Sequence, residues 1–172
     1  SGPGEIKAVS ETEICIFCHT PHNTRRDIPY LWNRQDQTVN YIPYQSSTLF
    51  ATVGQPTGAS KQCLSCHDGT VALENFGGVT SGTNYIDPSA RIGGVGGNDL
   101  STEHPISFDY TDALATNDGG LFPPTTTNSG LGSTIDDDML FNSRMECASC
   151  HDVHNRYGVL HLLKMSNVNS EL

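Results

Sequence analysis

The chain has 172 residues, of which 35% are hydrophobic, and carries a formal net charge of −10. This charge argues against nucleic acid and anionic membrane surfaces as partners, because both are bound through clustered Lys and Arg. No apolar run is long enough to span a membrane, so we expect a soluble protein with one domain over residues 1–172. The few apolar side chains cannot fill a core alone, which favours disulfides, metals or cofactors as additional support.

The chain begins with SGPGEIKAVS, which lacks a signal-peptide pattern and fits a secreted protein whose signal peptide has already been removed. Helical turns are expected only at residues 15–19, 63–67 and 147–151, which repeat one motif, and at residues 159–165. The segment TVNYIPYQSSTLFATV (38–53) is expected to contain a short strand or two. The segment HPISFDY (104–110) is expected to be extended, because Pro105 blocks a helix and apolar residues alternate after it.

All six cysteines occur in three copies of the motif C-x-x-C-H, which is the attachment motif of c-type haem. The copies are CIFCH (Cys15, Cys18, His19), CLSCH (Cys63, Cys66, His67) and CASCH (Cys147, Cys150, His151). Two thiols on one helical turn can form thioethers with both vinyl groups of a haem edge, and the histidine that follows then ligates the iron. We therefore expect three covalently bound haem c groups, numbered I to III in chain order.

Other uses of paired cysteines fit the pattern less well. Four-cysteine zinc sites need pairs in even number, and three pairs leave one over; a redox dithiol would need only one pair. A disulfide framework would not place a histidine after every second cysteine. Because covalent haem c is made outside the cytoplasmic membrane, we expect an extracellular or cell-surface protein, with the periplasm as the alternative.

Four of the seven histidines lie outside the attachment motifs: His22, His104, His154 and His161. The methionines could also ligate iron, but packing explains each of them better. Four further histidines for three irons favour bis-histidine ligation of every haem. Haems without an open iron position transfer electrons and do not bind substrate, so we expect an electron carrier and not an enzyme.

His22 and His154 each follow a proximal histidine by three residues, in CHTPH and CHDVH. Two imidazoles at this spacing lie on the same side of a turn, whereas the two axial ligands of an iron approach from opposite faces of the porphyrin. Each of these histidines is therefore expected to ligate an adjacent haem. In one arrangement His154 ligates haem I and His22 ligates haem III of the same chain; in the other, one ligand crosses to a neighbouring chain.

His104 lies 37 residues after His67, which is far enough to fold back over the other face of the haem at that site. We therefore expect His67 and His104 to ligate haem II. His161 lies in the apolar segment YGVLHLLKMSN and is expected to pack or to contact a haem propionate.

The segments between the motifs include two long loops rich in Gly, Pro, Asn and Thr, at residues 77–99 and 119–132. Long loops normally count against a compact fold, but bound haems can replace much of a hydrophobic core. The expected fold is mostly irregular and loop-rich, with short helices around the haem sites, few short strands and a core formed by stacked haems.

The segments CIFCHTPHN, CLSCHDGTVA, HPISFDY and CASCHDVHN together resemble multihaem cytochromes c with doubled attachment motifs. The resemblance is greatest to the extracellular cytochromes that polymerise into filaments, known as microbial nanowires. In that family, the histidine three residues after the first attachment motif ligates a haem of the adjacent subunit. The resemblance implies that His22 crosses the interface to haem III of the neighbour and that His154 serves haem I of its own chain.

The sequence thus predicts a tri-haem, bis-histidine cytochrome c for extracellular electron transfer, with subunits joined head to tail into a conductive filament of continuously stacked haems. Its partners are expected to be identical subunits, together with redox proteins or extracellular electron acceptors. The alternatives are a monomeric periplasmic electron shuttle and an electron-transfer subunit of a larger oxidoreductase. Small electron shuttles of the first kind are often rich in Lys.

Overall fold

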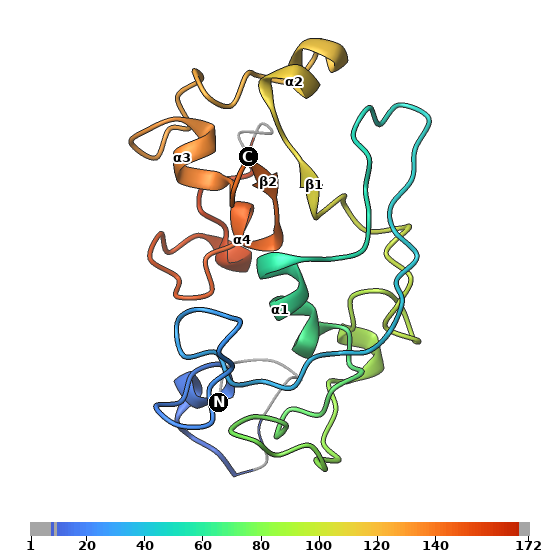
Figure 1. The fold of residues 1–172 in the computed structure, drawn as a ribbon, viewed down its shortest axis with the longest axis vertical. Helices are drawn as coiled ribbons and strands as arrows, with labels where there is room; N and C mark the ends of the chain where they lie inside the picture. The colour runs from blue at the N-terminus through green and yellow to red at the C-terminus, as the bar shows by residue number, and fades with distance from the viewer. Residues whose placement is uncertain (1–7, 9, 169–172) are drawn as a thin grey trace. The chain divides into compact units, whose positions relative to one another are not determined.

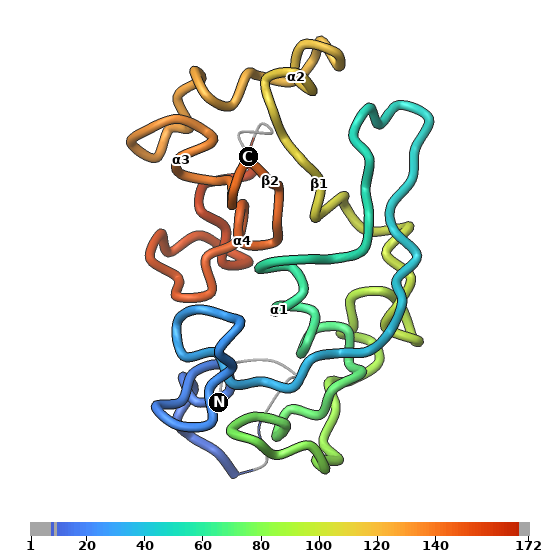
Figure 2. The backbone as a smooth tube through the Cα atoms, in the orientation of Figure 1, coloured from blue at the N-terminus to red at the C-terminus, as the bar shows by residue number. Residues whose placement is uncertain are grey.

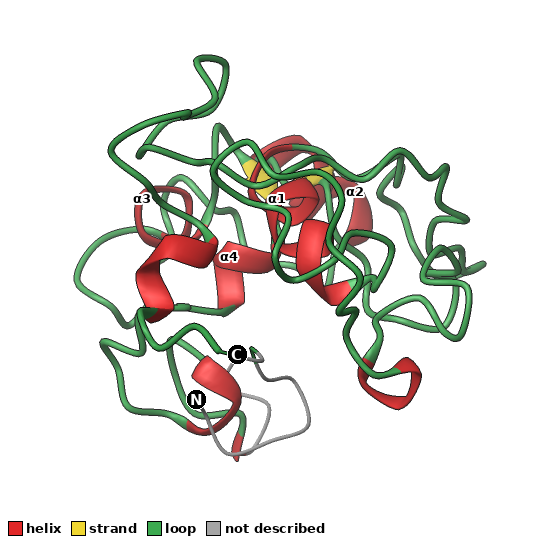
Figure 3. Ribbon diagram, turned by 90° about the horizontal axis from the view of Figure 1, so that it is seen from below, coloured by secondary structure: helices red, strands yellow, loops and turns green. Residues whose placement is uncertain are grey.

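The computed structural model describes residue 8 and residues 10–168, so the signal-peptide interpretation of SGPGEIKAVS falls almost wholly outside the described residues. Loops dominate the described part of the chain, as Figures 1 and 3 show. The elements are the 3-10 helices η1 (Ile14–Phe17), η2 (Pro88–Ala90) and η3 (Leu160–Leu162), the α-helices α1 (Gly58–His67), α2 (Asp112–Asp118), α3 (Ile135–Met139) and α4 (Cys147–Cys150), and the strands β1 (Phe108–Asp109) and β2 (Arg144–Met145). The expected loop-rich fold with short helices and few strands is confirmed.

The chain divides into two compact units, of which unit 1 comprises residues 1–42 and 61–103 and unit 2 comprises residues 43–60 and 104–172. The backbone trace in Figure 2 shows that each unit consists mainly of loops. The first two attachment motifs belong to unit 1 and the third belongs to unit 2. No helix in the described range is long and apolar enough to cross a membrane. The single haem-bearing domain stays a prediction.

Buried polar side chains hold the loops of unit 1 together. Among the described residues of unit 1 the buried apolar ones are few, and all except Leu64 of α1 come from outside the helices: Tyr41, Val71, Ala72, Leu73, Ile86 and Leu100. The Tyr41 hydroxyl donates to the buried Asp68 carboxylate at 2.5 Å, and the same carboxylate accepts from the Thr70 N–H at 2.7 Å. Unit 1 therefore depends on satisfied hydrogen bonds where a larger apolar core is missing.

Unit 2 contains the two-stranded antiparallel sheet, in which Phe108 lies opposite Met145 and Asp109 lies opposite Arg144. Phe108 is buried in a small core with Tyr110 and residues of the following segments, whereas Asp109 is exposed. The Asp109 carboxylate pairs with Arg144 across the two strands at 2.5 Å. The extended conformation expected for HPISFDY is thus confirmed at β1, whereas Ser107, directly before the strand, adopts a left-handed φ of 58°.

Helices α2 and α3 contradict the expectation that helical turns occur only at the motifs and near residues 159–165. Each begins after a threonine whose hydroxyl accepts a backbone hydrogen bond three residues on: Thr111 from Leu114 and Thr134 from Asp137. Helix α2 then ends at Gly119, which adopts a φ of 76°. Threonine at the N-cap and a left-handed glycine after the last turn are the usual boundaries of a helix.

The strand expected within residues 38–53 does not exist, although the structure describes that whole segment. Ile42 makes only an isolated bridge with Asp99. In this bridge the Ile42 N–H donates to the Asn98 carbonyl at 2.8 Å and the Ile42 carbonyl accepts from the Leu100 N–H at 2.9 Å.

Candidate haem-attachment sites

Each C-x-x-C-H motif lies on one helical turn, which confirms the expected helical turns at the three sites. At site I the His19 N–H donates to the Cys15 carbonyl at 2.9 Å, and at site III the His151 N–H donates to the Cys147 carbonyl at 3.0 Å. At site II the second half of α1 carries both cysteines and ends at His67. Residues three apart on a turn share a face, as two thiols must to reach one haem edge.

All six cysteines lie in the described part of the chain, and none of them forms a disulfide. Burial raises the pKa of three of the thiols, although a nearby cation opposes the shift: Arg34 for Cys18 and Cys66, and Lys164 for Cys150. Desolvation is thus the largest influence on the pKa of these three thiols.

Two of the three proximal histidines donate to a backbone carbonyl through Nδ1. The His19 Nδ1 lies 2.6 Å from the Tyr30 carbonyl oxygen, and the His151 Nδ1 lies 3.0 Å from the His161 carbonyl oxygen. Because a carbonyl oxygen can only accept, Nδ1 carries the proton in each ring and the lone pair is on Nε2. A metal-ligating histidine requires this tautomer, and a hydrogen bond from its other ring nitrogen to a carbonyl usually holds its ring in place.

Sites I and III share one backbone module, in which the chain leaves the attachment turn and returns to pair with it. We call residues 15–33 module I and residues 147–164 module III. The carbonyl acceptor lies 11 residues after the proximal histidine in module I and 10 residues after it in module III. Equivalent backbone hydrogen bonds hold the returning segments: Asn33 to Cys18 (2.9 Å) and Thr20 to Leu31 (3.2 Å) in module I, and Lys164 to Cys150 (2.8 Å) and Asp152 to Leu162 (2.7 Å) in module III.

In each module the acceptor carbonyl belongs to the first of two consecutive left-handed residues. These are Tyr30 and Leu31 (φ 63° and 59°) in module I, and His161 and Leu162 (φ 61° and 58°) in module III. An α-helix cannot pass through such residues, so the helix expected over residues 159–165 is reduced to the three-residue η3. Neither Tyr-Leu nor His-Leu favours this conformation, and nothing in the sequence indicates it.

His22 and His154 occupy equivalent positions in the two modules. Each is exposed and is followed by an asparagine in the left-handed region, with a φ of 58° at Asn23 and 51° at Asn155. His154 also approaches the Asp152 carboxylate, with 3.6 Å between Nδ1 and Oδ1. The shared C-H-x-x-H-N frame thus corresponds to a shared backbone conformation.

The structure brings His104 beside His151 within unit 2. The centres of the two imidazole rings are 6.5 Å apart and the ring planes are inclined by 24°. His67, which sequence spacing pairs with His104, belongs to unit 1. The ligation of haem II by His67 and His104 therefore stays a prediction, and His151 is the proximal histidine that His104 approaches.

Arg34 connects the first two attachment sites inside unit 1, a role that sequence reasoning missed. Only 2% of this residue is exposed. Its guanidinium donates to the Ser65 carbonyl at 3.1 Å, within the second motif, and to the Phe17 carbonyl at 3.5 Å, within the first. Two further bonds reach the carbonyls of Ala72 (3.1 Å) and Leu73 (3.0 Å). A buried cation thus lies between the segments that carry Cys18 and Cys66.

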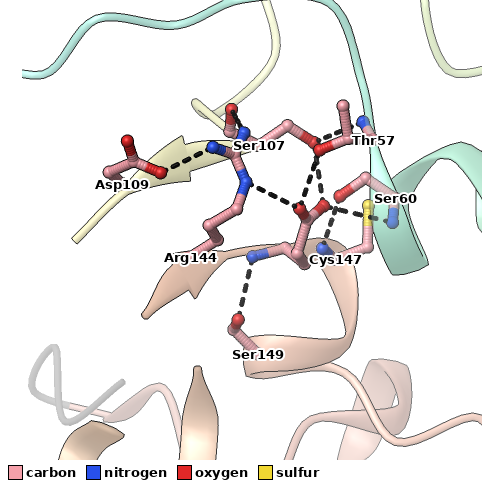
Figure 4. A network of polar contacts seen from close by, with 8 residues as sticks. Thr57, Ser60, Ser107, Asp109, Arg144, Cys147 and Ser149 are labelled. Carbon is pink, nitrogen blue, oxygen red and sulfur yellow. Dashed lines mark hydrogen bonds and ion pairs between the residues drawn. The ribbon is translucent and has the colours of Figure 1, made fainter. Parts of the chain in front are cut away.

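Glu146 anchors the third site within unit 2, and Figure 4 shows the polar network around this site, with Ser60, Ser107 and Cys147 among the labelled residues. Its buried carboxylate accepts from three groups of the neighbouring segments: the Ser107 hydroxyl (2.8 Å), the Ser60 N–H (3.2 Å) and the Thr57 hydroxyl (3.3 Å). The next residue, Cys147, donates its N–H to the Ser60 hydroxyl at 2.9 Å. The Glu146 N–H in turn donates to the Ser149 hydroxyl at 2.9 Å. Each group bonded to Glu146 therefore helps to fix the start of α4, where the attachment cysteine lies.

The residues of the three motifs are those that covalent haem attachment needs. Haem iron takes only two protein ligands, and its thioether bonds need two thiols on one turn. Comparison with known protein families finds no matching family model, and comparison with curated proteins finds no match.

Proposed function

We propose that this chain is a tri-haem, bis-histidine cytochrome c that transfers electrons outside the cell and polymerises head to tail into a conductive filament with continuous haem stacking. The observation that carries the proposal is the common module at sites I and III, where a C-x-x-C-H turn is combined with a proximal histidine protonated on Nδ1. When bound, haem c supplies a one-electron iron couple.

The cysteine pairs of the three motifs hold the cofactor by thioether bonds, and His19, His67 and His151 are the proximal ligands. His22, His104 and His154 supply the second axial positions. With every position filled by a histidine, the chain carries electrons and does not act as an enzyme. Electrons then pass to redox partner proteins or extracellular acceptors at the cell surface or beyond it.

Apolar side chains around the two modules support this assignment. Ile14 and Tyr30 of the first site are 73% and 84% exposed, and Val153 and Leu160 of the third are 71% and 76% exposed. Large apolar side chains at such exposure mark surfaces that something else covers. A porphyrin attached at the adjacent cysteines would cover them.

The position of His22 supports assembly through a shared ligand. It is exposed on the bend directly after site I, three residues beyond His19. A histidine so placed can ligate a haem of the adjacent subunit. A contact between two different surfaces does not close on itself, so it produces a filament.

The test begins with the haem content of the full chain matured in a cytochrome c-producing host. Mass spectrometry should find three haems per chain, and electron microscopy should find filaments. The His22→Ala variant should disperse them, whereas Arg26→Gln, a change at an exposed residue of the same loop, should leave them intact. Small particles with three haems would contradict the filament and indicate a monomeric shuttle or a subunit of a larger oxidoreductase. Absence of covalent haem would contradict the proposal as a whole.

A further inference from the structure

The ring geometry in unit 2 indicates which iron His104 serves. We propose that His104 is the second axial ligand of haem III, across the iron from His151. This inference rests on the proposed function, because it requires a haem attached at Cys147 and Cys150. It replaces the pairing with His67 that the sequence spacing suggests.

The distance between the two rings agrees with a shared metal. Metal–imidazole bonds are about 2 Å long and a ring centre lies about 1 Å beyond its bonded nitrogen, so rings on opposite sides of one metal have centres about 6 Å apart. The observed separation of His104 and His151 is 6.5 Å. The spacing therefore suits two rings separated by an iron.

Hydrogen bonding prepares His151 for this role. Its Nδ1 donates to the His161 carbonyl, so the lone pair that binds iron is on Nε2. The backbone turn that presents this carbonyl also occurs at site I, which makes it a property of the module and not of one loop.

Short-range pairing holds His104 next to this site. Pro105 keeps residue 104 out of a helix, and the chain then enters β1, which pairs with β2 immediately before α4. The Ser107 N–H donates to the Met145 carbonyl at 2.7 Å, and the Ser107 hydroxyl donates to Glu146 at 2.8 Å. His104 thus starts a segment whose register is fixed against the segment that carries His151.

This assignment changes the ligands left for the other haems. A third haem that has His151 and His104 cannot accept His22 from a neighbouring chain, so the partner implied by the family resemblance is replaced. His22 and His154 then serve haems I and II. His22 follows His19 by only three residues, and a bond to haem I of its own chain would require the chain to reach the opposite face of the porphyrin within that span.

Electron paramagnetic resonance of the oxidised, full-length holoprotein tests the ring geometry without any substitution. When the two imidazole planes are nearly parallel, both ligands split the same two iron d orbitals in the same sense, and the low-spin spectrum is rhombic. When the planes are perpendicular, the two splittings cancel and the low-spin spectrum is strongly anisotropic. With planes inclined by 24°, haem III should give a rhombic signal. A spectrum with no rhombic component would overturn the assignment.

Variants then identify the haem. The His104→Ala holoprotein should show one high-spin haem of three and lose the rhombic component that haem III contributes, whereas Thr102→Ala, at an exposed residue nearby, should match the wild type. In a Cys147→Ala/Cys150→Ala background, which lacks attachment of haem III, adding His104→Ala should leave both remaining haems low-spin. A further high-spin haem in that background would place His104 on haem I or II. Three low-spin haems in the single variant would also refute the assignment, and either result would leave the proposed function standing.

Discussion

The Nδ1 atom of His151 lies 3.0 Å from the carbonyl oxygen of His161, a residue with a φ of 61°. The left-handed conformation belongs to the residue that provides the acceptor, so the tautomer of the proximal histidine depends on a strained backbone 10 residues away. Module I repeats the relationship between His19 and Tyr30, whose φ is 63°. Because the same hydrogen bond occurs independently at sites I and III, we interpret it as a functional part of each site.

Substitution of His161 by proline should raise the reduction potential of one haem. Proline cannot adopt a positive φ, so the carbonyl would turn away and His151 would become a weaker donor to the oxidised iron. We expect an increase on the order of 50 mV, measured by spectroelectrochemistry. His161→Gly is the matched control, because glycine accepts the left-handed conformation and should leave the potential unchanged. Equal potentials in both variants would show that this carbonyl does not tune the site.

Glu146→Ala should destabilise unit 2. The substitution leaves the Ser107 hydroxyl and the Ser60 N–H buried without their acceptor, at an expected cost of about 2–4 kcal/mol in the free energy of unfolding. Glu146→Gln keeps one acceptor oxygen and should lose less. Denaturant unfolding followed by circular dichroism measures both variants. Equal stability of the alanine variant and the wild type would rule out the network in Figure 4 as a support of site III.

The sequence predicts features that a few neighbouring residues determine. The C-x-x-C-H spacing requires a helical turn, which is found at all three sites. Pro105 followed by alternating apolar residues predicts an extended segment, and this is found at β1 but not at Ser107, whose φ is 58°. The caps at Thr111 and Thr134 were equally local and explain α2 and α3, so those two helices could have been predicted.

Other parts of the site depend on contacts that are distant in sequence. Backbone carbonyls accept the hydrogen bonds of His19 and His151, and a carbonyl has no residue-type signal. Arg34 has the appearance of a surface residue in a polar segment, yet the carbonyls of several loops surround it. The approach of His104 to His151 follows from the pairing of β1 with β2. The sequence of a two-residue strand does not show which other strand it pairs with.

Acidification should weaken unit 1 through Asp36. Desolvation would raise the pKa of this carboxyl, but hydrogen bonds from Arg25 and Lys61 outweigh it and lower the pKa. A carboxyl with a lowered folded-state pKa contributes stability above its unfolded pKa of about 4 and loses it as the pH falls through the lower, folded value. The contribution of this half-buried group is about 1 kcal/mol.

The Asp36→Asn variant should therefore lose the part of the acid dependence that lies below pH 4 or so, when thermal unfolding is measured as a function of pH. Lys61→Met, which removes the ammonium 3.2 Å from Asp36, should reduce the same dependence in part. An unchanged pH profile in Asp36→Asn would assign the acid sensitivity of the protein to other carboxyls.

Removal of the Arg34 charge should lower the potentials of the haems at the first two sites. A buried cation favours the reduced iron, which carries one positive charge fewer than the oxidised form. A unit charge roughly 10 Å away in a medium with a dielectric constant of about 20 contributes about 1.7 kcal/mol, or about 70 mV for one electron. We therefore expect Arg34→Gln to shift two of the three midpoint potentials downward by an amount of this order.

Arg34→Lys separates charge from structure in this experiment. Lysine keeps the positive charge but cannot make the hydrogen bonds of the guanidinium to Ser65, Leu73, Ala72 and Phe17. If charge determines the potentials, the lysine variant should retain them while both variants unfold at lower denaturant concentration. If both variants shift the potentials equally, Arg34 acts by positioning the two attachment segments, and its charge is not the cause. The potential of haem III, attached in unit 2, is the internal reference for both variants.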